Sequence, residues 1–317
     1  MKILAVDDDQ LILKLLQETM FRAGFDDVTL ARSAEEAAVI VAEANPPFDC
    51  MLIDIKMPEI DGDHLCRWIR HLPNYVSTPI IMVTALLEKS DIDRAFAAGA
   101  SDYITKPIVL SELISRVKQI AHQSARDRLF AENTTRKTVS GGLTQELDRT
   151  DFMKPLKVGE IEGEIEIIAL ENYLLQLSQI KTNEMSAFSF VIKDAAKLHL
   201  VSARNEFHDV LRAMGKAISK HLRAPHLFIS YAGYGVFVGV MEGKSIDGIE
   251  RDLLEETVQQ SFEGTTIASK SGAPMKIELI MSIPKPLGKW SGLNVVDVLY
   301  RTIGDAEERC KYLRAVA

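Results

Sequence analysis

Acidic, hydroxyl and ammonium side chains stand at the ends of four short apolar runs in the first third of the chain. Asp7 and Asp8 follow KILAV, Asp54 follows MLI, Thr84 follows IIMV, and Lys106 follows DYIT. Carboxylates held close together repel one another and raise one another's pKa values unless a cation joins them. Their oxygens suit a hard cation such as Mg²⁺. A lysine and a hydroxyl beside that cation could hold a phosphoryl group.

The elements that must position these residues follow from the hydrophobic pattern. From residue 2 to about residue 122, short apolar runs alternate five times with amphipathic stretches. Five such repeats predict an α/β fold with a doubly wound parallel sheet. The carboxyl ends of parallel strands lie along one edge of such a sheet, where ligands bind. We therefore expect all five side chains at that edge.

Each of these residues also has an ordinary structural interpretation. An aspartate after a strand is a common helix N-cap, a threonine can be a loop hydroxyl, and Lys-Pro is a usual way to begin a helix. Any one of them alone would favour that interpretation. Their coincidence at four strand ends favours a site.

Four motifs, ILAVDDD, MLIDIKMPEIDG, IIMVTA and DYITKP, occur in this order across residues 1–122. With them the segment resembles the receiver domain of bacterial two-component response regulators, which has a flavodoxin-like (βα)5 fold. The resemblance implies that Asp54 accepts a phosphoryl group from a phosphohistidine. The donor would be a sensor histidine kinase or a phosphotransfer protein.

The resemblance also implies roles for the neighbouring residues. Asp7 and Asp8, with Asp54 and the backbone carbonyl of Lys56, would bind Mg²⁺. Two further side chains, Thr84 and Lys106, would hold the phosphoryl oxygens. Tyr103 would be the switch side chain that turns inward on phosphorylation.

The 317 residues allow two domains joined by a linker. We expect a helical stalk and linker over residues 123–159, where Thr, Ser and a Gly-Gly pair break the helical periodicity. Residues 160–317 read helix, strand, helix, hairpin, helix, strand, helix, which predicts an α+β sandwich with antiparallel strands.

That order of elements resembles the diguanylate cyclase (GGDEF) domain, a nucleotidyl-cyclase-like sandwich. AGYGV, residues 232–236, falls at the position of the family's G-G-D/E-E-F hairpin, so Tyr234 and Gly235 replace the acids. Metal-assisted cyclisation of GTP needs carboxylates to hold two metal ions. We therefore expect a degenerate domain without cyclase activity. Arg223, at the start of the family's inhibitory R-x-x-D site, could still contact a nucleotide, although His226 replaces the aspartate of that site.

These features favour a non-enzymatic response regulator whose output domain acts on a downstream protein, with a homodimer forming on phosphorylation. The main alternative is a phosphorylation-gated effector that binds cyclic di-GMP or GTP. An active cyclase is disfavoured by Tyr234 and Gly235. A DNA-binding protein is disfavoured because no helix-turn-helix pattern is present and residues 160–317 hold 18 Lys and Arg against 21 Asp and Glu.

The first residues, MKILAV followed by three aspartates, do not resemble a secretory signal. No apolar stretch reaches the length that spans a bilayer. The sequence thus predicts a cytoplasmic protein without membrane insertion.

Overall fold

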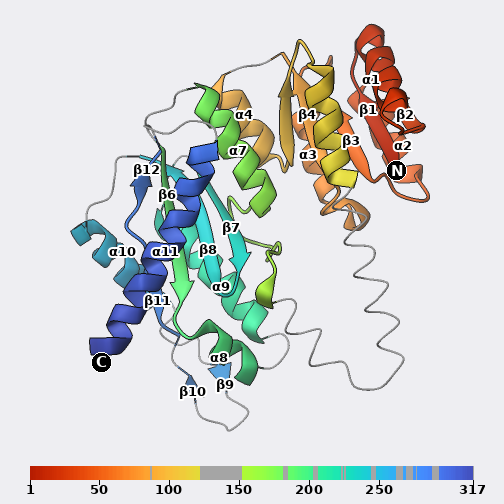
Figure 1. Cartoon of the computed structure of the whole chain (residues 1–317). Coiled ribbons are helices and arrows are strands. Elements are labelled where there is room, and N and C mark those ends of the chain that lie inside the picture. Colours follow the sequence, from red (N-terminus) through yellow and green to blue (C-terminus); the bar gives the residue numbers. More distant parts are fainter. Residues whose placement is uncertain are drawn as a thin grey trace. The chain divides into compact units, whose positions relative to one another are not determined.

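The computed structural model contains two compact units, Met1–Gly141 and Gly142–Ala317, called here the N-terminal and C-terminal units (Figure 1). Most of the predicted stalk and linker, residues 123–151, lies outside the described part of the chain. No described helix is both long and apolar enough to cross a membrane. The structure describes residues 1–85, 88–121, 152–180, 185–202, 206–222, 224, 226–243, 248–261, 267–268, 274–275, 277–287 and 293–316.

The N-terminal unit is built on a five-stranded parallel sheet with the strand order β2-β1-β3-β4-β5. Its central strands are buried almost throughout, as expected of strands inside a doubly wound sheet. The doubly wound parallel sheet predicted from the sequence is confirmed. The strands are β1 (Lys2–Val6), β2 (Asp27–Ala31), β3 (Cys50–Ile53), β4 (Ile80–Thr84) and β5 (Asp102–Thr105).

Strand register aligns the carboxyl ends of this sheet. Val6, the last residue of β1, pairs with Ala31 on one side and with Ile53 on the other. In the same way Thr84 at the end of β4 pairs with Thr105 at the end of β5. The residues that follow these strands therefore leave the sheet at the same edge.

Polar residues begin the first two helices of this unit. The carboxylate of Asp9 accepts a hydrogen bond from the Leu11 amide at 2.8 Å, and the Ser33 hydroxyl accepts one from the Glu36 amide at 3.2 Å. Residues 110–121 are also helical. The labelled helices of this unit are α1 (Gln10–Arg22), α2 (Ala34–Glu43), α3 (Gly62–Arg70), the short 3-10 helix η1 (Pro73–Tyr75) and α4 (Lys89–Ala97).

The C-terminal unit is α+β with an antiparallel sheet, as predicted. Its strands follow the order β11-β6-β8-β7, and β12 also pairs with β6. The sequence did not indicate β12 or a separate two-stranded ribbon. The strands are β6 (Met185–Ile192), β7 (Leu227–Gly233), β8 (Val236–Glu242), β11 (Leu279–Met281), β12 (Lys285–Pro286) and the ribbon β9 (Ile267–Ala268) with β10 (Pro274–Met275).

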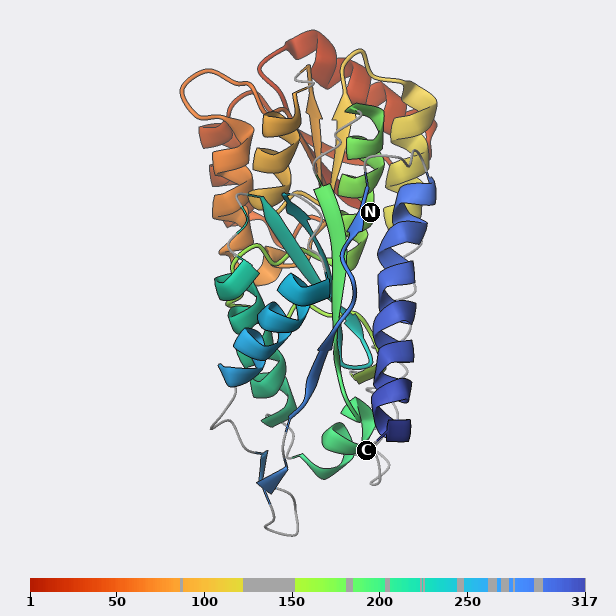
Figure 2. The same ribbon diagram turned by 90° about the vertical axis from the view of Figure 1, so that its left-hand side faces the viewer.

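Helices cover both faces of this second sheet (Figure 2). One face is covered by α7 and α11, which also contact each other, and the other by α9 and α10. The short helix α8 was not predicted. The helices are α7 (Ile167–Ile180), α8 (Ala195–Val201), α9 (Glu206–Leu222), α10 (Gly248–Gln260) and α11 (Leu293–Val316).

The AGYGV segment forms the tight turn of the β7-β8 hairpin. Gly233, Tyr234 and Gly235 all have positive φ angles, of 91°, 55° and 77°, a backbone region that suits glycine and is costly for tyrosine. A Cβ atom added to Gly235 would lie 2.3 Å from the Cβ of Ala195. The hairpin therefore packs directly against the first residue of α8.

We expect Gly235→Ala to lower the stability of the C-terminal unit by about 1–3 kcal/mol, because the new methyl group meets Ala195 and the backbone has positive φ. Gly304→Ala is the matched control, since a Cβ atom at this exposed position of α11 meets nothing within 4 Å. It should stabilise α11 by roughly 0.5–1 kcal/mol. Calorimetric melting of the full chain measures both, and equal shifts in the two variants would contradict the proposed close contact.

Candidate functional site

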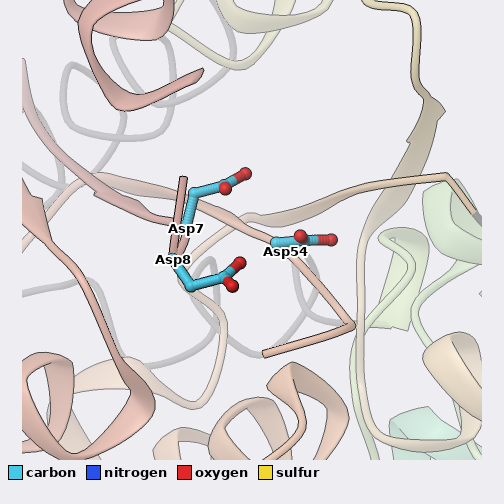
Figure 3. A group of neighbouring side chains, drawn as sticks. All are labelled: Asp7, Asp8 and Asp54. Carbon is cyan, nitrogen blue, oxygen red and sulfur yellow. The ribbon is translucent and has the colours of Figure 1, made fainter. Parts of the chain in front are cut away.

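Three carboxylates gather at the carboxyl edge of the N-terminal sheet (Figure 3). Asp7 and Asp8 directly follow β1, and Asp54 directly follows β3. One carboxylate oxygen from each lies within 4.8 Å of the other two. The structure thus brings together the three acids that the sequence placed at strand ends.

Backbone hydrogen bonds fix these positions by continuing the strand ladders past the strand ends. The Asp7 amide donates to the Ala31 carbonyl at 3.2 Å, and the Asp54 amide donates to the Val6 carbonyl at 2.9 Å. The Lys106 amide likewise donates to the Thr84 carbonyl at 2.7 Å. The strand ladders therefore fix the main chain at Asp7, Asp54 and Lys106.

The acids differ in their exposure to solvent. Asp7 is 1% exposed and Asp54 is 5% exposed, whereas Asp8 lies at the surface. Burial raises the pKa of Asp7, and its hydrogen bond from Lys106 opposes that rise. The cluster is thus a half-enclosed pocket with one open side at Asp8.

The ammonium group of Lys106 bridges the two buried acids. Its Nζ atom lies 2.7 Å from Asp7 Oδ2 and 2.8 Å from Asp54 Oδ2. Burial acts to lower the pKa of Lys106, but its hydrogen bonds to Asp54 and Asp7 outweigh burial and hold that pKa above its usual value. The lysine is therefore charged, and its positive charge cancels one of the negative charges of the pocket.

The loop after Asp54 passes close to its backbone. A Cβ atom on Gly62, the first residue of α3, would lie 1.9 Å from the Asp54 carbonyl oxygen, so only glycine fits there. The Lys56 amide lies 3.4 Å from Asp54 Oδ1, and the Lys56 ammonium binds Asp61 at 3.0 Å. The Lys56 peptide therefore borders the Asp54 carboxylate, while the Lys56 side chain points toward Asp61. The metal-binding role of the Lys56 carbonyl remains a prediction.

Thr84 and Tyr103 are both fully buried, with an exposed fraction of 0%. Burial raises the pKa of the Tyr103 phenol well above its usual value, and the charges of Asp91 and Asp54 add to this rise. The phenol therefore stays neutral. Tyr103 is thus already directed inward, within electrostatic reach of Asp54.

Comparison with known proteins extends these observations. Residues 3–118 match the response regulator receiver domain family. The response regulator MprA of Mycobacterium leprae is 32% identical over 163 residues, which cover 48% of this chain and 69% of MprA. The chain belongs to the response regulator family. Its receiver domain is the N-terminal unit, and the acidic pocket of Asp7, Asp8 and Asp54 is the type of Mg²⁺ site found in receiver domains.

Other relatives match over the same N-terminal part. The transcriptional regulatory protein ResD of Bacillus subtilis is 38% identical over 44% of this chain and 55% of ResD. A putative response regulator from Chloroflexus aurantiacus, known as a crystal structure, is 37% identical over 38% of this chain and 95% of its own, with a TM-score of 0.35. The chain thus spans only about half the length of ResD.

The receiver domain also contains an ion cluster that the sequence analysis missed. Asp63, buried in the first turn of α3, lies 3.4 Å from Arg94 Nε on α4, 3.8 Å from Arg67 NH2 and 3.4 Å from His64 Nδ1. The four-residue spacing of Asp63 and Arg67 was a visible signal, but the distant Arg94 was not. The cluster joins α3, which begins at Gly62 against Asp54, to α4.

The predicted output-domain residues are only partly described. Arg223 lies outside the described residues. Tyr234 is 53% exposed at the hairpin turn. Lys193, which was not among the predicted residues, directly follows β6 and pairs with Glu278 at 2.6 Å. Within the described ranges, Asp7, Asp8 and Asp54 are the only group of three or more His, Cys, Asp or Glu residues placed to share a metal ion.

We expect Lys106→Met to bind Mg²⁺ more tightly than the wild type at neutral pH, on the order of tenfold, because the ammonium competes with a cation for Asp7 and Asp54. Isothermal calorimetry of the full chain measures the Kd. Lys56→Met is the matched control, because its ammonium binds Asp61 outside the pocket. Equal Mg²⁺ affinity in wild type and Lys106→Met would show that Lys106 does not compete.

Proposed function

We propose that Asp54 is the phosphoryl acceptor of this response regulator. The observation that supports this most is the position of its carboxylate, which shares the pocket with Asp7 and Asp8 and accepts a hydrogen bond from Lys106 at 2.8 Å. The carboxylate is 5% exposed beside the exposed Asp8. It can therefore be reached from the side of Asp8, with Asp7 and Lys106 next to it.

Mg²⁺ is the cation that this pocket suits. Three carboxylates and one ammonium leave two negative charges, which one divalent ion balances. All the side-chain donors are oxygens, and one of the acids is open to solvent, as a partly hydrated Mg²⁺ requires. Asp7, Asp8 and Asp54 would hold the ion, and the ion would neutralise charge on the phosphoryl oxygens.

The transfer is a displacement at phosphorus. An Asp54 carboxylate oxygen forms a bond to the phosphorus of a phosphohistidine while the nitrogen–phosphorus bond breaks and its electron pair returns to the histidine ring. The product is an acyl phosphate on Asp54. Lys106 reaches Asp54 and Asp7 alike, so its ammonium is placed to hold a phosphoryl oxygen next to either acid.

Two buried residues near the pocket, Thr84 and Tyr103, would respond to phosphorylation of Asp54. Thr84 ends the neighbouring strand β4, and its hydroxyl would hold a second phosphoryl oxygen. Tyr103, buried and within electrostatic reach of Asp54, would follow the movement of Thr84. The added negative charge would in this way alter the face formed by α4 and residues 110–121.

The receiver domain implies a cognate histidine kinase. A phosphotransfer protein could supply the phosphoryl group instead, because the chemistry at Asp54 needs only an exposed phosphohistidine. A homodimer formed through the α4 face on phosphorylation would carry the signal onward.

The C-terminal unit is a degenerate GGDEF-like domain that acts by binding a downstream protein and has no enzymatic activity. This is supported by the antiparallel hairpin at the expected place in the order of elements. It is also supported by the turn itself, where Tyr234 offers no metal-binding carboxylate and Gly235 leaves no space for one. Lys193, which directly follows β6, supplies no carboxylate either and pairs with Glu278.

A phosphorylation-gated effector of cyclic di-GMP or GTP is the second candidate. A cavity of about 470 Å³ lies beside the hairpin turn, and its polar lining combines Tyr234, Lys197 and Lys311 with Asp194 and Glu307. An aromatic ring and two ammonium groups could hold a base and a phosphate.

DNA binding is not part of the proposal. Two cations on α9 are engaged in ion pairs within the C-terminal unit, because Arg212 binds Asp209 at 3.0 Å and Lys216 binds Glu160 at 2.7 Å. A helix face whose cations are paired in this way is a poor contact for a phosphate backbone.

Incubation of the full chain with its kinase or with acetyl phosphate and Mg²⁺ should label one aspartate, and Asp54→Asn should abolish the label, because an amide is no nucleophile for phosphorus. Asp61→Asn is the control, since Asp61 binds Lys56 at the surface. It should retain most of the label. Phosphate release under alkali and mass spectrometry identify the site, and label that persists in Asp54→Asn would overturn the proposal.

Incubation of the full chain with GTP and Mg²⁺ should yield no cyclic dinucleotide, because the hairpin has no carboxylate at Tyr234 or Gly235. Chromatography detects the product, and a sample labelled in parallel at Asp54 controls for folding. Calorimetric titration with cyclic di-GMP distinguishes the two candidates. Micromolar binding that is lost in Arg223→Ala would favour the effector, and absence of heat would favour the protein-binding platform.

A further inference from the structure

Residues 152–165, called here the strap, lead from the linker to α7 and pack against the β7-β8 hairpin. The carbonyl of Phe152, the first described residue of that unit, accepts hydrogen bonds from the Tyr234 amide at 2.8 Å and from the Tyr231 hydroxyl at 3.3 Å. The same Tyr231 hydroxyl accepts a bond from the Gly235 amide at 3.0 Å. The Phe152 carbonyl therefore binds the Tyr234 amide directly and the Gly235 amide through the Tyr231 hydroxyl, in a turn whose residues have positive φ.

The Phe152 side chain is anchored among aromatic rings. It stacks on His199 at 4.9 Å, with an angle of 13° between the rings, and meets Phe207 and Tyr234 edge-on at 5.6 and 5.7 Å. It is 9% exposed. The same ring forms one wall of the cavity of about 470 Å³ beside the turn, together with Tyr234 and the first residues of α8.

The rest of the strap is held independently of Phe152. Ile161 fits a notch at Gly215 on α9, where a Cβ atom would lie 2.1 Å from Ile161 Cδ1. Glu164 accepts bonds from the Val158 and Gly159 amides at 2.5 and 2.8 Å. The Ile165 amide also donates to the Ile229 carbonyl on β7 at 3.0 Å. Residues 161–165 are therefore attached to the unit without Phe152, and Phe152 is the described residue of the strap nearest to the linker.

We propose that Phe152 is a releasable anchor through which the linker controls the hairpin turn and the cavity beside it. Release removes the acceptor of the Tyr234 amide, frees the Tyr231 hydroxyl that holds Gly235, and removes one wall of the cavity. The Tyr234 surface then changes shape. This inference rests on the proposed function, because phosphorylation of Asp54 supplies the signal.

Hydrogen–deuterium exchange of the full chain tests this proposal. Residues 231–236 contain the two amides that depend on Phe152, and they should exchange on the order of tenfold faster after addition of Mg²⁺ and beryllofluoride, a phosphoryl analogue. Phe152→Ala should show the faster exchange without the analogue and little further change with it. Met153→Ala, which truncates a half-exposed neighbour, should behave like the wild type.

A milder variant covers the case in which Phe152→Ala unfolds the unit. Phe152→Leu keeps the carbonyl and a buried apolar side chain but loses the stacking on His199, so its exchange at residues 231–236 should be intermediate. Exchange equal to the wild type in the folded variants would overturn the proposal.

The exchange at residues 54–62, next to the acceptor, separates the two possible failures. If these residues respond to beryllofluoride in the wild type and residues 231–236 do not, Phe152 is a static packing residue and the anchor proposal fails while the proposed function stands. If neither segment responds, the proposed function fails, and the anchor proposal fails with it. Asp54→Asn should abolish both responses.

Discussion

Electrostatic repulsion among three carboxylates is the constraint on which the receiver domain depends. Oxygens of Asp7, Asp8 and Asp54 lie within 4.8 Å of one another, and two charges at this distance repel by about 3 kcal/mol at an effective dielectric constant of 20. The fold tolerates this because the strand ladders fix the backbone of Asp7 and Asp54, and because Lys106 bridges the two buried acids. The remaining charge imbalance is the reason that the pocket should attract a divalent cation and then a phosphoryl group.

The residues around the pocket connect Asp54 to α3 and α4. Gly62 is required because α3 begins against the Asp54 carbonyl oxygen, and the next residue, Asp63, joins α3 to Arg94 on α4. Tyr103 is affected electrostatically by Asp54 and by Arg94. A change of charge at Asp54 therefore has a short physical route, through one ion pair and one phenol, to the helix that forms the outer face of the unit.

Much of the receiver domain could be predicted from sequence because the information is local. Strand runs and the residues that follow them place Asp7, Asp54 and Lys106 at one sheet edge without knowledge of any contact. The Asp63–Arg94 pair and the two partners of Lys106 could not be predicted, because they depend on helix and loop positions set by packing. In the C-terminal unit the order of elements was predictable, whereas the short elements α8 and β12 have too few residues to show a period. The strap lacks helical or strand periodicity, so residues 152–159 were assigned to the linker, although their contacts lie on the hairpin.

The contacts of the β7-β8 hairpin explain how its strained Tyr-Gly turn is stabilised. Tyr234 has a positive φ angle that costs free energy, and the turn is compensated by the Phe152 carbonyl, the Tyr231 hydroxyl and the fit of Gly235 against Ala195. The first contact comes from the strap, the second from β7 within the hairpin, and the third from α8. The turn thus serves as the docking point of the chain that arrives from the linker, and its exposed tyrosine is presented in a conformation that this docking determines. If the C-terminal unit signals by binding, as proposed, the hairpin turn would link its binding surface to the receiver domain, because the Phe152 carbonyl that holds the turn belongs to the segment that follows the linker.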